Sequence, residues 1–209
     1  NRYAIMKNAN FGGRRVQLVG GYQRLDELSQ ILKPFSDRVL KEHCLDLPPK
    51  TYIERQVELT DEQSKAYATM KSAALASLKG KMATAPHILT QLMRLHQITC
   101  GHLKNDDDSI TEIKNNRINS LIELLEEVEG KVIIWANYVY DIKQIVAAIT
   151  KKYGEHSIVQ YYGAIPADVR QKNIEKFQDP KSPARFFIGN PQTGGYGITL
   201  TEANNVVYY

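Results

Sequence analysis

Residues 189 to 200 offer the clearest chemistry in this sequence. They read Gly-Asn-Pro-Gln-Thr-Gly-Gly-Tyr-Gly-Ile-Thr-Leu, with three glycines between Gly194 and Gly197. Glycines allow a backbone to approach a phosphate closely, so that main-chain amides donate the hydrogen bonds. The spacing differs from the G-x-G-x-x-G dinucleotide fingerprint. We therefore interpret the stretch either as a phosphate-binding loop or as a tight turn.

Two further stretches carry side chains that can donate to a phosphate. Ala136-Asn137-Tyr138 follows one apolar run, and Tyr162-Gly163-Ala164 follows another, with Arg170 a few residues beyond it. The Asn137 amide can donate a neutral hydrogen bond to phosphate, and the Arg170 guanidinium a charge-assisted one. Either residue can equally be an ordinary surface residue, so neither stretch is specific alone.

The elements that must position these stretches follow a regular alternation after residue 117. Apolar runs predict strands at 132–135, 158–161 and 186–188 and another from 206, with helices at 118–128, 142–149 and 166–177 between them. Continuous apolar strands separated by helices predict a parallel sheet covered on both faces. Ligand sites in such sheets lie beyond the carboxyl ends of the strands. We therefore expect all three stretches at one edge of the sheet.

The upstream part is predicted to be mainly helical. Gly12-Gly13 and Gly20-Gly21 predict turns ahead of an amphipathic segment at 25–35, and alternation at 52–59 predicts a short strand. Thr60 and Gln63 have the spacing of a capping box, which predicts a helix from there to about residue 78.

A second upstream helix is predicted from Pro86 to a stop at Gly101. It has one broad apolar face, made of Ile88, Leu89, Leu92, Met93, Leu95 and Ile98. Residues 104–111 contain three consecutive aspartates and are predicted to be a loop and a domain boundary.

Composition sets broad limits on the class of protein. The apolar content of 43% is enough for a buried core, and the formal net charge is +4. The first 25 residues contain five basic residues and no acidic one, which fits a strip along a nucleic-acid backbone or a solvated terminus. With two cysteines and no apolar run long enough to cross a membrane, we expect an intracellular protein, cytoplasmic or nuclear, without a membrane partner.

A zinc site is the alternative chemistry in the upstream part. His96, Cys100 and His102 have spacing compatible with a metal, and His43 and Cys44 are possible further ligands. The predicted helix already brings His96 and Cys100 together, one turn apart, without any metal. We therefore assign no metal-binding residue.

The order and spacing of the three stretches resemble the later helicase motifs of the Swi/Snf-type ATPases of superfamily two. Residues 131–138 resemble the fourth motif, residues 161–177 the next, and residues 194–203 the fifth. Upstream, three segments resemble the region that joins the two motor lobes and its helical protrusion, namely 32–50, 57–63 and 100–102. Cys100 and His102 match positions there that are not metal ligands.

This resemblance implies a fold and a function. The fold is α/β, a RecA-like parallel sheet with helices on both faces, preceded by a helical protrusion region. Residues 1–112 would be the inter-lobe linker and protrusion, and 113–209 the second RecA-like lobe, incomplete at its end. The implied function is part of an ATP-dependent translocase or remodelling motor on double-stranded DNA. A non-catalytic RecA-like module that binds nucleic acid or protein, and a strand-separating helicase, remain alternatives.

The resemblance also implies roles for individual residues. ATP would lie near Gly197 and Thr199, with Mg²⁺ as its companion in the intact motor, and no catalytic residue is assigned. The departures from the family pattern are Pro191, Gln192 and Thr199, where a small hydroxyl residue, an arginine and an asparagine are common. The DNA backbone, bound without sequence preference, would contact Asn137, Gly163, Arg170, Gln192, Thr193 and Gly194.

The parts of the motor that would hydrolyse ATP are not found in the sequence. Neither Gly80-Lys81 nor Gly130-Lys131 fits the G-x-x-x-x-G-K-[ST] pattern of a Walker A loop, and the arginine-rich sixth motif is missing. We expect that the chain needs a first RecA-like lobe as partner and alone neither binds ATP tightly nor hydrolyses it. Valine at Gly194 or Gly197 is expected to disturb the loop without unfolding the chain.

Overall fold

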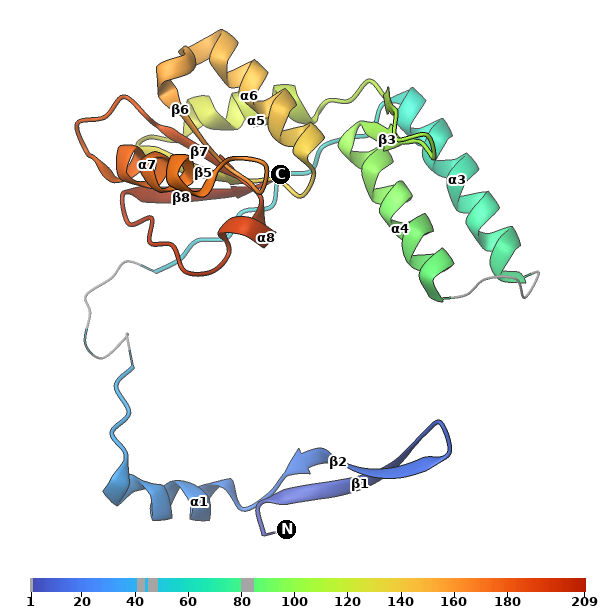
Figure 1. Ribbon diagram of the computed structural model, residues 1–209, viewed down its shortest axis with the longest axis vertical. Helices are drawn as coiled ribbons and strands as arrows, with labels where there is room; N and C mark the ends of the chain where they lie inside the picture. The colour runs from blue at the N-terminus through green and yellow to red at the C-terminus, as the bar shows by residue number, and fades with distance from the viewer. Residues whose placement is uncertain (1, 41–43, 45–48, 80–84) are drawn as a thin grey trace. The chain divides into compact units, whose positions relative to one another are not determined.

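The computed structural model describes residues 2–40, 44, 49–79 and 85–209, which form two compact units (Figure 1). The first unit is Asn1–Glu54 and the second is Arg55–Tyr209. His43 and part of the predicted extended segment at 47–50 lie outside the described residues. Within the described part, no helix combines the length and apolarity needed to cross a membrane.

The first unit is a hairpin followed by a short helix. Strand β1 (Ala4–Phe11) pairs antiparallel with β2 (Arg14–Tyr22), and α1 (Leu25–Leu32) runs into the 3-10 turn η1 (Lys33–Phe35). The turn at Gly12-Gly13 is confirmed, since both glycines have positive φ. The predicted turn at Gly20-Gly21 is wrong. Those glycines lie within β2 opposite a register shift at Ile5/Met6, where an extra strand residue is accommodated as a bulge.

The second unit opens with two helices, α3 (Asp61–Lys79) and α4 (Ala85–Cys100). The predicted capping box is confirmed. The backbone N–H of Gln63 donates to Thr60 Oγ1 at 3.2 Å, and the backbone N–H of Thr60 donates to Gln63 Oε1 at 3.1 Å. The predicted stop at Gly101 is also confirmed, with a φ of 88°. Gln63 Nε2 donates to the carbonyl of Ile98 at 2.9 Å, which ties the start of α3 to the end of α4.

Three upstream predictions are wrong in whole or in part. Residues 51–60 have no regular structure, because no neighbouring strand pairs with the predicted one. On α4 the predicted apolar face is only partly covered, since Leu89, Leu92 and Met93 are more than half exposed while Ile98 is buried. The predicted loop at 104–111 is the turn of a small hairpin, in which β3 (His102–Lys104) pairs antiparallel with β4 (Ile110–Glu112).

The predicted parallel sheet is confirmed. Its four strands all run parallel, and their order is β6 (Ile158–Tyr161), β7 (Phe186–Gly189), β5 (Lys131–Trp135) and β8 (Ala203–Tyr208). The connecting helices are α5 (Arg117–Glu127), α6 (Val139–Tyr153) and α7 (Ala167–Gln178), with the 3-10 turn η2 (Glu155–Ser157) after α6. The last strand begins three residues before the predicted start at Val206.

Helices cover both faces of this sheet, as expected (Figure 1). On one face α5 and α6 pack their apolar residues against β5 and β7, around Leu125, Ile142 and Ile134, which are all fully buried. On the other face Phe177 of α7 packs against Phe187 of β7. The strands are therefore held rigidly, and the loops at their carboxyl ends are fixed in position relative to one another.

Candidate nucleic-acid interface

Asn190 joins the loops at the carboxyl ends of three strands. Its side chain Nδ2 donates to the carbonyl of Asn137 at 2.7 Å, and its backbone N–H donates to the carbonyl of Tyr161 at 3.1 Å. Only 9% of the residue is exposed. The loops after β5, β6 and β7 therefore meet at one sheet edge, which confirms the predicted placement.

The same residue organises the glycine-rich stretch. Asn190 Oδ1 accepts from the Gln192 amide at 2.8 Å and caps a single helical turn, α8 (Pro191–Gly194). Proline is favoured at a first helical position, because the missing N–H would have no partner there. Pro191, a departure from the family pattern, therefore fits the local fold.

The residues that share this edge form a surface open to water. Asn137, Gly163 and Gln192 are exposed. A Cβ built on Gly163 would lie 3.8 Å from Thr193 Oγ1, so the loop after β6 is next to α8. We call Asn137, Gly163, Gln192 and Thr193 the edge surface. The structure thus brings together four of the six residues predicted to contact DNA.

Arg170 is held differently from the edge surface. It lies half-buried on α7, with its guanidinium carbon 5.3 Å from the centre of the Tyr161 ring. Its Nε atom is buried and has no hydrogen-bond partner. A guanidinium stacked on a ring retains N–H groups in its plane for an acceptor. Arg170 therefore places a positive charge close to the end of β6, while its unpaired Nε donor is buried and out of reach of a ligand.

Gly194, the remaining predicted DNA contact, has a packing role. It is buried, and a Cβ at this position would lie 2.7 and 2.9 Å from two atoms of the Trp135 ring. The Tyr161 ring would be 3.2 Å away. A larger side chain would therefore collide with the protein itself. This packing predicts a loss of stability for valine at Gly194, against the expectation that the substitution leaves the fold undisturbed.

Gly197 and Thr199 lie in the segment that leads to β8. Gly197 has a φ of 75° with no atom within 4 Å of a built Cβ, so the backbone conformation and not space requires glycine. Thr199 is exposed between Ile198 and Leu200, which pack against the Phe177 side of the sheet. Among the described residues, no hydrogen bond joins either predicted ATP contact to the edge surface.

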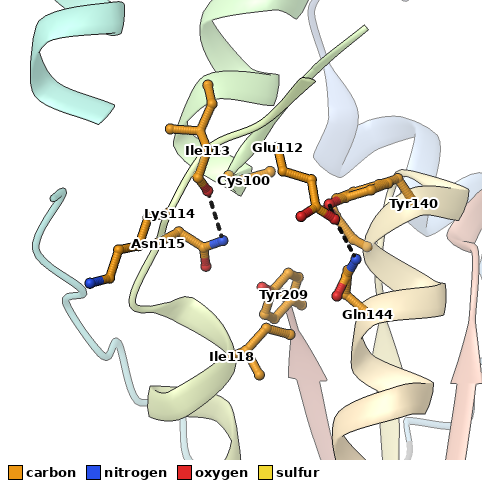
Figure 2. Close-up of a pocket in the computed structure, with 11 residues that line it drawn as sticks. Cys100, Glu112, Ile113, Lys114, Asn115, Ile118, Tyr140, Gln144 and Tyr209 are labelled. Atoms are coloured by element: carbon orange, nitrogen blue, oxygen red, sulfur yellow. Dashed lines mark hydrogen bonds between the residues drawn. The ribbon is translucent and has the colours of Figure 1, made fainter. Parts of the chain in front are cut away.

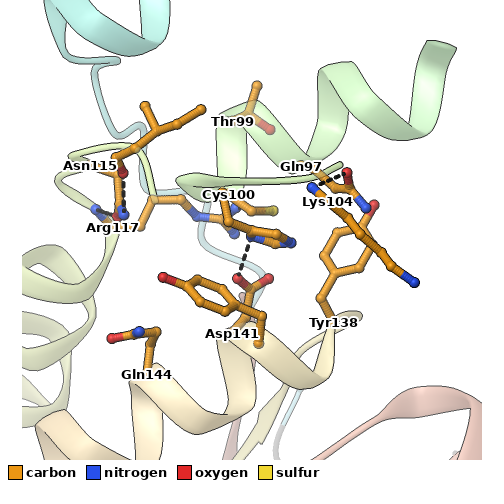
Figure 3. A network of polar contacts seen from close by, with 12 residues as sticks. Gln97, Thr99, Cys100, Lys104, Asn115, Arg117, Tyr138, Asp141 and Gln144 are labelled. Carbon is orange, nitrogen blue, oxygen red and sulfur yellow. Dashed lines mark hydrogen bonds and ion pairs between the residues drawn. The ribbon is translucent and has the colours of Figure 1, made fainter. Parts of the chain in front are cut away.

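A partly buried polar cluster lies where the start of α6 meets α4 and β3 (Figure 3). His102 of β3 and Asp141 of α6 are 2% and 3% exposed, and His102 Nδ1 lies 3.2 Å from Asp141 Oδ1. The Tyr138 ring packs edge-on against His102 at 5.0 Å. His96 Nδ1 lies 2.9 Å from the Tyr138 hydroxyl. We call these four residues the joint, because they connect the end of α4 and β3 to the start of α6.

Cys100 lies beside the joint, and its thiol is expected to be unreactive. Burial raises the pKa of its thiol to about 11, although Arg117 Nη1 lies 2.8 Å from the sulfur and opposes this shift. A thiol that stays protonated is a poor nucleophile and a poor metal ligand. Among the described residues, no three His, Cys, Asp or Glu side chains gather as a metal site, and His43 of the zinc hypothesis lies outside them.

A pocket of about 350 Å³ opens next to the joint (Figure 2). Its wall includes Glu112, which accepts hydrogen bonds from the Tyr140 hydroxyl at 2.6 Å and from Gln144 Nε2 at 3.3 Å. Burial, and then the bond to Glu112, raise the pKa of Tyr140 to about 12. Burial also raises the pKa of Tyr209. The pocket therefore offers hydrogen-bonding groups but neither an ionised phenol nor an ionised thiol at neutral pH.

Comparison with known protein families shows which kind of domain has this parallel sheet. The model of the helicase conserved C-terminal domain matches residues 114–209, which include the whole parallel sheet. These residues are therefore similar to such a domain, and their parallel sheet with helices on both faces has the RecA-like fold.

The relatives and solved structures that this chain resembles include Swi/Snf-type proteins, as the resemblance predicted. The putative ATP-dependent helicase/translocase YwqA of Bacillus subtilis is 29% identical over 90% of this chain, and chromodomain-helicase-DNA-binding protein 7 of chicken is 26% identical over 90%. The SWI2/SNF2 ATPase core of Sulfolobus solfataricus, solved in complex with double-stranded DNA, matches 88% of this chain and 40% of its own, with a TM-score of 0.62 and 26% identity. The chain spans 21% of the length of the Bacillus relative.

Proposed function

We propose that the intact protein is an ATP-driven motor that moves along or remodels double-stranded DNA, and that this chain supplies its second lobe. The observation that carries the proposal is the edge surface, where Asn190 gathers three loops at the carboxyl ends of parallel strands. The similarity to helicases, and to an ATPase core solved with double-stranded DNA, supports it. An intracellular location follows from the same proposal.

The edge surface suits a phosphate backbone. Asn137 and Gln192 present amide donors to water, and Thr193 offers a hydroxyl. Arg170 adds a half-buried positive charge near the end of β6. Contacts of this kind go to phosphate and sugar, which position a protein without reading bases. We therefore propose binding that is independent of DNA sequence.

The nucleotide would meet this lobe at Gly197 and Thr199, and only part of a nucleotide site is available there. The exposed glycine-rich backbone and the Thr199 hydroxyl can donate to phosphate oxygens, which fits one side of ATP. Residues 189–200 contain no lysine and no carboxylate, so the groups for γ-phosphate and Mg²⁺ must come from elsewhere in the intact protein. Hydrolysis of bound ATP would supply the energy for movement. We propose that the chain alone does not turn over ATP.

Binding of labelled duplexes to the 209-residue chain tests the DNA interface. If about three phosphates are neutralised, affinity should fall roughly fortyfold when monovalent salt rises about fourfold, equally for two unrelated sequences. Gln192→Ala and Asn137→Ala should each weaken binding about threefold or more, by loss of one hydrogen bond. The matched control is Asn204→Ala, at an exposed asparagine at the amino end of β8.

Salt-insensitive binding, a strong preference for one sequence, or an equal effect of Asn204→Ala would contradict this interface. In the intact protein, a duplex-tracking assay and a forked duplex separate movement on DNA from strand separation. We expect tracking with the strands kept together.

A further inference from the structure

The start of α6 is held by the joint. Tyr138, the residue before α6, places its hydroxyl 2.9 Å from His96 Nδ1 of α4, and Asp141 of the first helical turn meets His102 of β3. Figure 3 shows both side chains pointing from α6 toward the end of α4. The position of α6 is therefore fixed against α4 and β3 by polar contacts, half of them buried.

The residues just before Tyr138 are held from the other side. Asn190 Nδ2 donates to the carbonyls of Ala136 at 3.3 Å and of Asn137 at 2.7 Å. On the carboxyl side, the amide of Ile142 donates to the Tyr138 carbonyl at 3.1 Å and closes the first turn of α6. The loop 136–138 therefore lies between two clamps, one from the edge surface and one from the joint, with the exposed Asn137 side chain in the middle.

We infer that Tyr138 and Asp141 are positioning residues, which hold Asn137 where it can donate to a DNA phosphate. The inference rests on the proposed DNA contact of the edge surface. A buried pair such as His102 and Asp141 gains little net stability over apolar packing, but it fixes one geometry. Through it, the orientation of the helices α3 and α4 is transmitted to a side chain on the edge surface.

The sharpest test removes one hydroxyl. Tyr138→Phe keeps the ring against His102 and His96 and loses only the hydroxyl contact with His96 Nδ1. We expect an unchanged midpoint of unfolding, and faster hydrogen exchange of the Ile142 amide. The dissociation constant for duplex DNA should rise about three- to tenfold, the range for one hydrogen bond. The matched control is Tyr140→Phe, which loses its bond to Glu112 but lies beyond the clamped loop, and both readouts should stay as in the unchanged chain.

A second variant separates positioning from packing. Asn137→Ala should weaken duplex binding by itself, and combining it with Tyr138→Phe should weaken it no further, because Tyr138 acts through Asn137. Asp141→Asn keeps the shape of the side chain and should show the same dependence on Asn137. Fully additive effects in the double variant would overturn the inference.

The remaining outcomes distinguish this inference from the proposed function. If Asn137→Ala weakens binding while Tyr138→Phe leaves both affinity and exchange unchanged, the positioning role is wrong and the DNA interface stands. If the unchanged chain binds no duplex, the proposed DNA interface is wrong. Hydrogen exchange of the Ile142 backbone amide then still tests whether the joint holds the loop 136–138. An unchanged exchange rate in Tyr138→Phe would overturn the clamp as well.

Discussion

The edge surface and the joint are both polar and lie on either side of the same three-residue loop, yet they differ in their access to water. Asn137 and Gln192 of the edge surface are exposed, whereas His102 and Asp141 of the joint are almost completely buried. Exposed donors remain available to a ligand, whereas a buried side chain can interact only with its neighbours inside the protein. Removing a member of the buried pair His102 and Asp141 should therefore cost stability first, and changes on the edge surface should cost binding first.

The largest effect is expected from Asp141→Ala. It leaves the buried His102 without the neighbouring carboxylate, and an unpaired buried polar group costs about 1 to 3 kcal/mol, in addition to the packing that is lost with the side chain. Urea denaturation of the chain measures the loss. The control is Asp168→Ala, an exposed aspartate in the first turn of α7, which should change the free energy of unfolding by less than about 0.5 kcal/mol. Equal stabilities for the two variants would remove the distinction between joint and surface.

Gly194→Val tests a residue that lies beside the exposed edge surface but is itself buried against Trp135. Overpacking of this kind costs about 1 to 3 kcal/mol. Thermal unfolding should therefore begin at a lower temperature, with DNA present or absent. Gly163→Ala is the control, since its Cβ would meet only Thr193 Oγ1 at 3.8 Å. A Gly194→Val chain as stable as the control would show that the Trp135 ring moves aside freely.

The smallest free-energy change is expected at Gly197. This residue tests whether the segment before β8 has a function beyond its backbone conformation. Gly197→Val in the intact protein should lower DNA-stimulated ATP hydrolysis about tenfold, which corresponds to about 1.4 kcal/mol. The matched control is Gly130→Val. Gly130 has a φ of 77° and only Asn204 near a built Cβ, so both variants carry the same backbone strain in open space. Both should therefore lose similar stability. A similar loss of hydrolysis in both would mean that the Gly197 segment is only a turn.

Patterns set by neighbours in the sequence predicted much of the fold. Strands buried on both faces, such as 132–135 and 186–188, are apolar throughout, and this signal does not depend on which strands become neighbours. The capping box at Thr60 and Gln63 is equally local, because all its hydrogen bonds lie within one turn. The parallel lobe, its covered faces and the start of α3 could therefore be derived from the sequence alone.

Features that depend on a distant partner were missed. The segment 52–59 alternates like a strand but has no strand beside it, while β1 and β2 pair with each other and are mostly exposed on both faces. The α4 face around Leu92 is apolar in pattern, yet no other element covers it within the described residues. Alternation and helical spacing are properties of one element and can be read from its own sequence. Strand pairing and burial depend on a second element as well, so one segment does not reveal them.

The same limit applies to the site. Asn137 could be proposed from its place after a buried strand and Gln192 from the family resemblance, but nothing in the sequence distinguishes Asn190 from an ordinary turn residue. Its role depends on the strand order, which brings the ends of β5 and β6 to either side of it. The contact between His102 and Asp141 spans 39 residues and has no local signal at all. Helix-start acidic residues are common, so Asp141 stood out only once its burial was known.

Gln63 helps to attach the helices α3 and α4 to the rest of the second unit at one end, so that the pair could act as a lever. Its side chain binds the last-turn carbonyls of α4, and its capping partner Thr60 donates through Oγ1 to the carbonyl of Lys114 at 2.7 Å. Both helices are thus fastened at one end, next to the joint. The 19 residues of α3 extend about 28 Å from that fulcrum. A rotation of about 10° at the fastened end would therefore move the far end of α3 by about 5 Å, so small changes beside the loop 136–138 become large displacements at the far end of the helix.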